Sequence, residues 1–273
     1  MSSNLTDLRL AVLIDAENVP RRRMKAIIQE LTLYGTPTIK RIYGDWTSPN
    51  LSNWKQELLE NAIQPIQQHS YTTGKNSSDS AMIIDAMDIL YAGHTDGFCI
   101  VSSDSDFTRL ATRLRESGMK VIGVGEKKTP SSFIAACDKF IYIEVIAQQA
   151  EESEEQRKKQ VLPSYQQPRR NYPQAQPEHD EHEPQNTEPI RQSIPQEVER
   201  LVIQSVKDLA DEDGYAFLGE IGNLLLKKQP DFDPRNFGFN KLTPMIQAMG
   251  KFEIDVRQTA SPNIKHIYVK LKE

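Results

Sequence analysis

Short apolar runs alternate with amphipathic helical patterns through the first half of the chain, and this alternation limits the possible folds more than any other feature. The run RLAVLI at residues 9–14 is rich in branched side chains, which is typical of a buried parallel strand. Similar runs predict strands at 38–43, 62–67, 98–101, 119–125 and 140–144, with helices opened by Pro20 and at 51–61, 80–91, 106–116 and 131–136. Strands that alternate with helices imply an α/β fold with a parallel sheet and right-handed crossovers.

Carboxylates follow the predicted strands at the points where ligands bind. The strand at 98–101 leads into Asp104 and Asp106, and Asp15 directly follows the strand at 9–14. Asp79 lies where the helix at 80–91 begins. In open α/β sheets ligands bind at the carboxyl ends of the strands, so we expect all four carboxylates to lie at that edge.

These aspartates fit two roles. Asp is among the best helix N-caps, and Asp79, Asp104 or Asp106 taken alone fits that role. Asp15 resists it, because it closes an apolar strand five residues ahead of the first helix. Four converging carboxylates also repel one another unless a cation lies between them. All-oxygen ligands select Mg²⁺ or Mn²⁺, which can activate water for phosphodiester hydrolysis, so we expect a metal site.

Polar and basic side chains flank this predicted site. Asn18 supplies an amide that can orient a ligand, Lys75 precedes Asp79, and Arg109 follows Asp106 at helical spacing. Arg21 and Arg22 open the first helix, where basic residues oppose the helix dipole. Contact with phosphate would explain that cost, and an ordinary solvated face is the alternative. We expect Asp85 and Asp88, which lie off the apolar stripe of the helix at 80–91, to be solvated.

Composition narrows the class of protein. The net charge of −5 argues against a protein that simply coats nucleic acid, so any nucleic-acid binding needs local basic patches. The two cysteines lie in apolar contexts, as expected for a reducing cytoplasm. No apolar run approaches the roughly 18 residues of a membrane span, and the N-terminus lacks the pattern of a signal peptide. We therefore expect a cytoplasmic protein.

The chain divides into three parts by composition. Residues 1–148 hold the α/β pattern, and residues 149–195 carry seven prolines and many charged and glutamine residues, which predicts a disordered linker. Residues 196–273 predict three helices and a terminal hairpin, as in a winged helix-turn-helix. Such a linker would give the third part an r.m.s. reach of roughly 35–40 Å.

The first part resembles the NYN domain, a bacterial and eukaryotic branch of the PIN-like ribonucleases. The matching stretches are LIDAENVP at 13–20, GKNSSDSAMIIDAMDIL at 74–90 and VSSDSDFTRLATRLRESGMKVIGVG at 101–125. The resemblance implies a Rossmann-like sheet and metal-dependent phosphodiester hydrolysis of RNA. Carried over by motif, Asp15, Asp79, Asp104 and Asp106 are the acidic set, with Asn18 as their polar neighbour.

The third part resembles the OST-HTH/LOTUS domain, more loosely, through residues 214–246 and the closing FEIDV. That resemblance implies binding of RNA or of a protein partner. The expected surface consists of basic and aromatic residues, namely Lys227, Lys228, Arg235, Phe237, Phe239 and Lys241. Phe237 and Phe239 fit the hydrophobic core of a winged helix equally well.

The leading hypothesis is an RNA endonuclease whose C-terminal domain recruits substrate. A non-enzymatic adaptor, with a weak metal site and an RNA- or protein-binding C-terminal domain, is the alternative. An aspartyl-phosphate phosphatase ranks below both, because its D-x-D pair would follow the first strand, whereas here it follows the fourth. The substrate, the biological pathway, the number of metal ions and the oligomeric state are not determined by the sequence.

Overall fold

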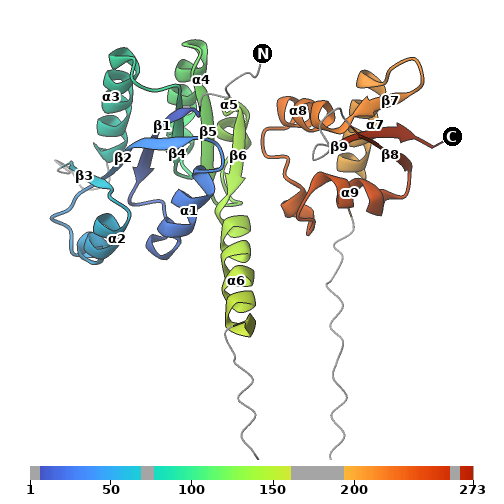
Figure 1. Ribbon diagram of the computed structural model, residues 1–273. Coiled ribbons are helices and arrows are strands. Elements are labelled where there is room, and N and C mark those ends of the chain that lie inside the picture. Colours follow the sequence, from blue (N-terminus) through green and yellow to red (C-terminus); the bar gives the residue numbers. More distant parts are fainter. Residues whose placement is uncertain (1–6, 69–76, 161–193, 259–264, 273) are drawn as a thin grey trace, which may run out of the picture.

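Six parallel strands form the central sheet of the N-terminal domain (Figure 1). The structure is a computed structural model and describes residues 7–68, 77–160, 194–258 and 265–272. The strands are β1 (Arg9–Asp15), β2 (Thr36–Gly44), β3 (Gln64–Gln67), β4 (Gly97–Val101), β5 (Lys120–Gly125) and β6 (Lys139–Tyr142). Their order is β3-β2-β1-β4-β5-β6, and every neighbouring pair is parallel, which confirms the predicted Rossmann-like α/β sheet.

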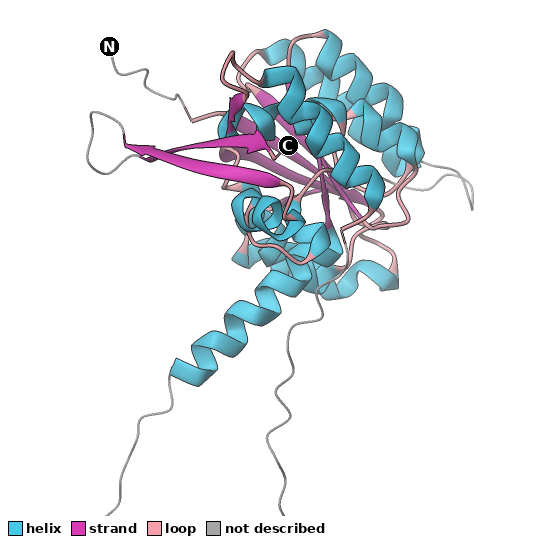
Figure 2. Ribbon diagram, turned by 90° about the vertical axis from the view of Figure 1, so that its right-hand side faces the viewer, coloured by secondary structure: helices cyan, strands magenta, loops and turns pink. Residues whose placement is uncertain are grey.

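Helices cover both faces of this sheet (Figure 2). One face packs against α1 (Met24–Leu31), the 3₁₀ turn η2 (Pro49–Trp54), α2 (Lys55–Glu60) and α6 (Ile143–Gln160). The other packs against α3 (Ser77–Ala92), α4 (Thr108–Glu116) and α5 (Ser131–Ala136). Leu10 and Val12 of β1 point to the first face and Ala11 to the second, all fully buried. The apolar run that predicted β1 therefore reflects burial on both sides.

The strand order reverses between β1 and β4, and this reversal positions the candidate site. β1 pairs with β2 on one side and β4 on the other. The crossovers leave β1 and β4 in opposite directions, so a crevice opens at their carboxyl ends. β1 ends at Asp15 and β4 at Val101, just before Ser102.

The C-terminal domain consists of three helices and a small antiparallel sheet of order β7-β9-β8. Its elements are α7 (Gln196–Leu209), β7 (Tyr215–Phe217), α8 (Leu218–Lys228), the 3₁₀ turn η4 (Pro234–Phe237), α9 (Leu242–Met249), β8 (Phe252–Gln258) and β9 (Lys265–Leu271). The predicted hairpin is confirmed, but the segment read as a turn at 214–216 includes a third strand. Phe237 and Phe239 pack against the core of this domain.

The last helix of the N-terminal domain extends into the first residues of the predicted linker. α6 continues to Gln160, so residues 149–160 are helical. This stretch, AEESEEQRKKQ after Gln149, is made of good helix formers, with acids ahead of bases as the helix dipole favours. The rest of the predicted linker, 161–193, lies outside the described residues. Among the helices that the structure describes, none is long and apolar enough to cross a membrane.

The prediction of a solvated Asp85 was wrong. From α3 this carboxylate pairs with the Arg41 guanidinium and accepts a hydrogen bond from the Tyr43 hydroxyl, both on β2. The helical stripe predicts only which side chains contact the apolar core. It could not reveal that long polar side chains of β2 reach across to the flank of α3.

Candidate metal centre

Asp15 lies at the bottom of the crevice, where β1 ends. Asp15 is only 1% exposed, and its carboxylate accepts hydrogen bonds from three donors. Oδ1 accepts a hydrogen bond from the backbone N–H of Glu17 at 3.0 Å. Oδ2 accepts from Asn18 Nδ2 at 2.6 Å and from Ser102 Oγ at 2.9 Å. The strand end and these donors together fix the orientation of the carboxylate.

Asp104 is positioned by the turn that follows β4. Its Oδ1 accepts the backbone N–H of Asp106 at 2.9 Å, so Asp104 caps the 3₁₀ turn η3 (Ser105–Phe107). Its own backbone N–H donates to Ser102 Oγ at 3.1 Å. The buried Ser102 hydroxyl therefore joins Asp15 to Asp104. Capping and ligand binding are compatible roles here, because the cap holds the side chain in place.

Three of the predicted carboxylates gather at one point. Asp79, Asp104 and Asp106 each offer an oxygen atom, and these oxygens lie within 4.8 Å of one another. Two oxygens bound to one Mg²⁺ at about 2.1 Å are at most about 4.2 Å apart, so small side-chain rotations suffice for a shared ion. Asp15 is not a member of this group and lies beside it.

The acidic cluster (Asp15, Asp79, Asp104 and Asp106) is electrostatically unfavourable without a cation. Burial and then the charge of Asp15, followed by Asp104, Asp106 and Glu17, raise the pKa of Asp79 to about 6. The pKa of Glu17 is also raised, by burial and then by Asp15 and Asp45. A divalent ion would remove this repulsion, and the all-oxygen donor set fits Mg²⁺ or Mn²⁺.

A cavity of about 510 Å³ continues along the same edge of the sheet. Its lining comes from the ends of β1 and β2 and from η2, and includes Glu17, Asp45, Asn50 and Trp54. This volume lies within the range of about 300–1,000 Å³ common for small-molecule sites. The cavity lies beside Asp15 in the chain, since Ala16 and Glu17 line it.

The predicted basic residues of the N-terminal domain are placed differently from one another. Arg22 and Arg109 are exposed. Arg21 donates to the backbone oxygen of Asn53 at 2.6 Å and lies 3.5 Å from Glu57, so it contacts the η2–α2 segment. Lys75 lies outside the described residues.

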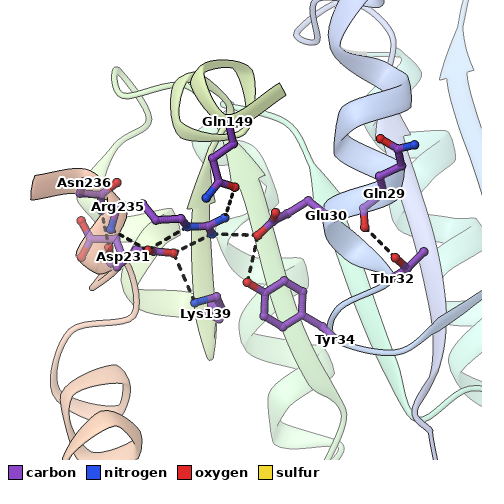
Figure 3. Close-up of polar contacts among 10 residues, drawn as sticks. Gln29, Glu30, Thr32, Tyr34, Lys139, Gln149, Asp231, Arg235 and Asn236 are labelled. Atoms are coloured by element: carbon purple, nitrogen blue, oxygen red, sulfur yellow. Dashed lines mark hydrogen bonds and ion pairs between the residues drawn. The ribbon is translucent and has the colours of Figure 1, made fainter. Parts of the chain in front are cut away.

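The basic residues predicted for the C-terminal domain also differ in exposure. Lys227 and Lys241 are exposed, and Lys228 is exposed but bonds to Asp208 at 2.7 Å. Arg235 does not lie on an open surface. Its side chain is 12% exposed and bonds to Glu30 of the N-terminal domain (Figure 3). The sequence could not reveal this, because the partner comes from the other domain.

The sequence did not predict one surface of the C-terminal domain, on its small sheet. The outer face of the small sheet carries the aromatic side chains of Tyr215, Phe217 and Tyr268. The Arg257 guanidinium lies 4.2 Å from the centroid of Tyr268 and 5.1 Å from that of Tyr215, and Lys270 Nζ lies 5.4 Å from the latter. We name these five residues the aromatic face. Alternation in YAF and KHIYVK was the available signal, hidden because 214–216 was read as a turn.

Comparison with known families and structures gave matches over both domains. The family profile of the NYN domain matches residues 9–144, and that of the OST-HTH/LOTUS domain matches residues 192–264. A protein of unknown function from Vibrio parahaemolyticus is 20% identical, covers 52% of this chain and 96% of its own, and gives a TM-score of 0.45. An uncharacterized protein from Nitrosomonas europaea is 29% identical over 37% of this chain and 93% of its own, with a TM-score of 0.27. Comparison with curated proteins gave no match.

Proposed function

Because the chain carries an NYN domain at residues 9–144 and an OST-HTH/LOTUS domain at residues 192–264, we propose that it is a metal-dependent RNA endonuclease. NYN domains belong to the PIN-like nuclease superfamily, and OST-HTH/LOTUS domains bind RNA. The observation that carries the proposal is the convergence of Asp79, Asp104 and Asp106 within 4.8 Å at the carboxyl edge of the sheet. Three carboxylates that close repel one another, and a divalent cation of the kind used in phosphodiester hydrolysis would relieve that repulsion.

In the proposed site Asp79, Asp104 and Asp106 would hold Mg²⁺ or Mn²⁺, which when bound would acidify a water and offset charge on a leaving oxygen. Hydrogen bonds from Asn18 and Ser102 hold the Asp15 carboxylate in a rigid position. There it adds negative charge beside the three proposed metal ligands. Asp104 keeps its orientation through the η3 cap, so substrate binding need not order it.

RNA contacts are proposed on both domains. Arg22 follows Asp15 in the sequence and Arg109 follows Asp106, and both side chains are exposed. Each can pair with a phosphate group of RNA. On the C-terminal domain the aromatic face offers rings for base stacking, with Lys270 for the phosphate backbone, whereas Arg257 is already paired with Asp255 at 2.7 Å. This combination of rings and cations is typical of surfaces that bind single-stranded nucleic acid without strict sequence preference.

The proposal is tested by cleavage of labelled single-stranded RNA by the full chain with Mn²⁺, Mg²⁺ or EDTA. We expect cleavage with metal and none with EDTA, and a loss of at least about 100-fold in Asp104→Asn, since a ligand is removed. Asp88→Asn is the matched control, because Asp88 is an exposed acid on the same α3 helix that carries Asp79. Equal cleavage by wild type and Asp104→Asn would exclude a nuclease that uses this site.

The alternative is an RNA-binding adaptor that does not cleave. The aromatic face favours it as a second candidate, because these residues belong to the C-terminal domain and need no acidic site to bind RNA. RNA binding with unchanged RNA ends across single-stranded and structured substrates would support the adaptor. A protein partner for the C-terminal domain and a cytoplasmic location, the latter consistent with two buried free cysteines, remain part of the proposal.

A further inference from the structure

The β6 strand forms one edge of the six-stranded sheet, and a segment of the C-terminal domain covers it. The backbone N–H of Phe140 donates to the Pro230 carbonyl at 2.9 Å. The Tyr142 hydroxyl donates to Asp231 Oδ2 at 2.6 Å. An open strand edge exposes unpaired backbone groups and invites association with other chains, so natural proteins cover such edges. Residues 230–235 serve as that cover here.

Arg235 lies at the centre of the contact between the domains (Figure 3). Its guanidinium donates to Glu30 Oε1 of α1 at 2.8 Å and to Gln149 Oε1 of α6 at 2.8 Å. It also donates twice to Asp233, at 2.9 Å and 2.7 Å, which fixes the guanidinium plane within its own domain. One side chain therefore joins two helices of the N-terminal domain to the segment that covers β6.

The charges in this contact are balanced across the two domains. The N-terminal domain contributes Glu30 and Lys139, and the C-terminal domain contributes Asp233 and Arg235. Their side chains are 7%, 13%, 11% and 12% exposed, respectively. Buried charges are costly unless each is paired, and here Glu30 and Asp233 each have a base within 4.0 Å. Asp231 instead accepts the hydrogen bond from the Tyr142 hydroxyl. Burial works against the ionised form of Asp233, yet hydrogen bonds from Arg235 hold its pKa below the ordinary value.

The position of the contact relates it to the acidic cluster. Tyr142 ends β6 at the carboxyl edge of the sheet, and β6 is two strands away from β4. At about 4.8 Å per strand, that separation is roughly 10 Å across the sheet. The covering segment therefore starts close to the edge at which Asp104 lies.

We propose that the β6 edge is a docking site for the C-terminal domain, closed by the Arg235 guanidinium, and that the two domains act as one body. The domain is then a fixed part of the substrate-binding architecture, in place of the freely tethered module that the composition predicted. Docking within one chain needs no second molecule to be captured, so a contact of this modest size can persist. The proposal does not depend on RNA cleavage.

The test is ¹⁵N relaxation of the full chain, which measures how each domain tumbles. We expect one rotational correlation time shared by α/β-domain and C-terminal amides in the wild type. Arg235→Met should give two different and shorter times, because two domains then tumble separately. Arg200→Met, the same substitution at an exposed arginine of α7, should keep the shared time.

A second variant keeps the test decisive if Arg235→Met disturbs the C-terminal domain itself. Glu30→Gln removes the partner charge from the other domain and should separate the two correlation times while both sets of amide peaks stay dispersed. Two different times in the wild type would overturn the docking proposal. So would a shared time retained in both Arg235→Met and Glu30→Gln.

Discussion

The protonation of Asp79 affects both the stability of the fold and the binding of a metal ion. In the folded protein its pKa is raised to about 6, first by burial and then by the neighbouring carboxylates. An unfolded Asp titrates near about 3.9, so the folded state binds this proton more tightly than the unfolded chain does. The contribution of Asp79 to stability therefore falls as the pH rises from about 4 to about 6, and the full penalty applies above that range.

We predict that Asp79→Asn removes this penalty in metal-free protein. Urea unfolding in EDTA at about pH 5 and about pH 7.5 should show the variant gaining stability over wild type more strongly at the higher pH. Titrating groups that do not interact with Asp79 cancel in the difference between the two proteins. An equal difference at both pH values would show that Asp79 titrates as an ordinary exposed acid.

Metal binding should also depend on the protonation of Asp79, but metal affinity should rise with pH whereas the contribution of Asp79 to stability falls. A bound cation needs the ionised carboxylate, so Mn²⁺ competes with the Asp79 proton. We predict that the Mn²⁺ affinity of the wild-type chain, measured by calorimetry, rises as the pH increases through about 6. An affinity that is constant from about pH 5 to about pH 7.5 would contradict this coupling.

The sequence identified the acidic residues because each follows a strand or begins a helix in a parallel α/β pattern. It could not separate Asp15 from the other three, because that distinction depends on side-chain direction at the end of β1. Asp85 was expected to be solvated because it lies off the apolar stripe, yet it pairs with Arg41, whereas Asp79 joins the cluster. Arg235 was predicted, from the OST-HTH/LOTUS resemblance, to belong to a surface that binds RNA or a protein. Its partner Glu30 is 205 residues away, beyond any local pattern.

At the scale of elements, the Arg41–Asp85 pair with Tyr43 holds α3 against β2. Both charged side chains are mostly buried, 28% and 21% exposed. We predict that Asp85→Ala lowers the free energy of unfolding by about 2–4 kcal/mol, because Arg41 and the Tyr43 hydroxyl lose their partner. Asp88→Ala, on the exposed side of α3, should change it by less than about 0.5 kcal/mol. Denaturant unfolding measures both, and equal effects would show that the pair does not anchor α3.

The small sheet of the C-terminal domain carries the prediction for RNA binding. Loss of one stacking ring costs about 1–3 kcal/mol, so Tyr268→Ala should weaken binding of labelled single-stranded RNA by roughly 5- to 150-fold in fluorescence anisotropy. Tyr91→Ala serves as the control, since Tyr91 is 74% exposed on α3 of the other domain. Unchanged affinity in a folded Tyr268→Ala variant would contradict RNA binding by the aromatic face. It would favour the surface with Lys227 and Lys241 that was expected from the sequence.

Most elements of the fold follow from periodicity, and their exceptions have physical causes. β1, β4 and β5 are buried on both faces and read as continuous apolar runs. β7 is only three residues long and begins beside Gly214, so its alternation was too short to recognise. α6 runs through residues 149–160, whose charged helix formers resemble linker composition.

At the scale of the whole molecule, the relation between the domains could not be predicted. The side chains that pair across the contact are charged or polar and lie on four separate segments, namely α1, β6, α6 and residues 230–235, and composition alone favoured a tether. The structure places the C-terminal domain on the β6 edge, with Arg235 against α1 and α6 (Figure 3).

The central claim is that the acidic cluster binds a divalent cation, and diffraction from crystals soaked in Mn²⁺ tests it most directly. We predict an anomalous peak about 2.0–2.2 Å from carboxylate oxygens of Asp79, Asp104 and Asp106. The same soak of Asp104→Asn crystals should weaken or abolish the peak. Absence of a peak at the cluster in wild-type crystals at saturating Mn²⁺ would contradict the claim, and so would a peak unchanged in Asp104→Asn.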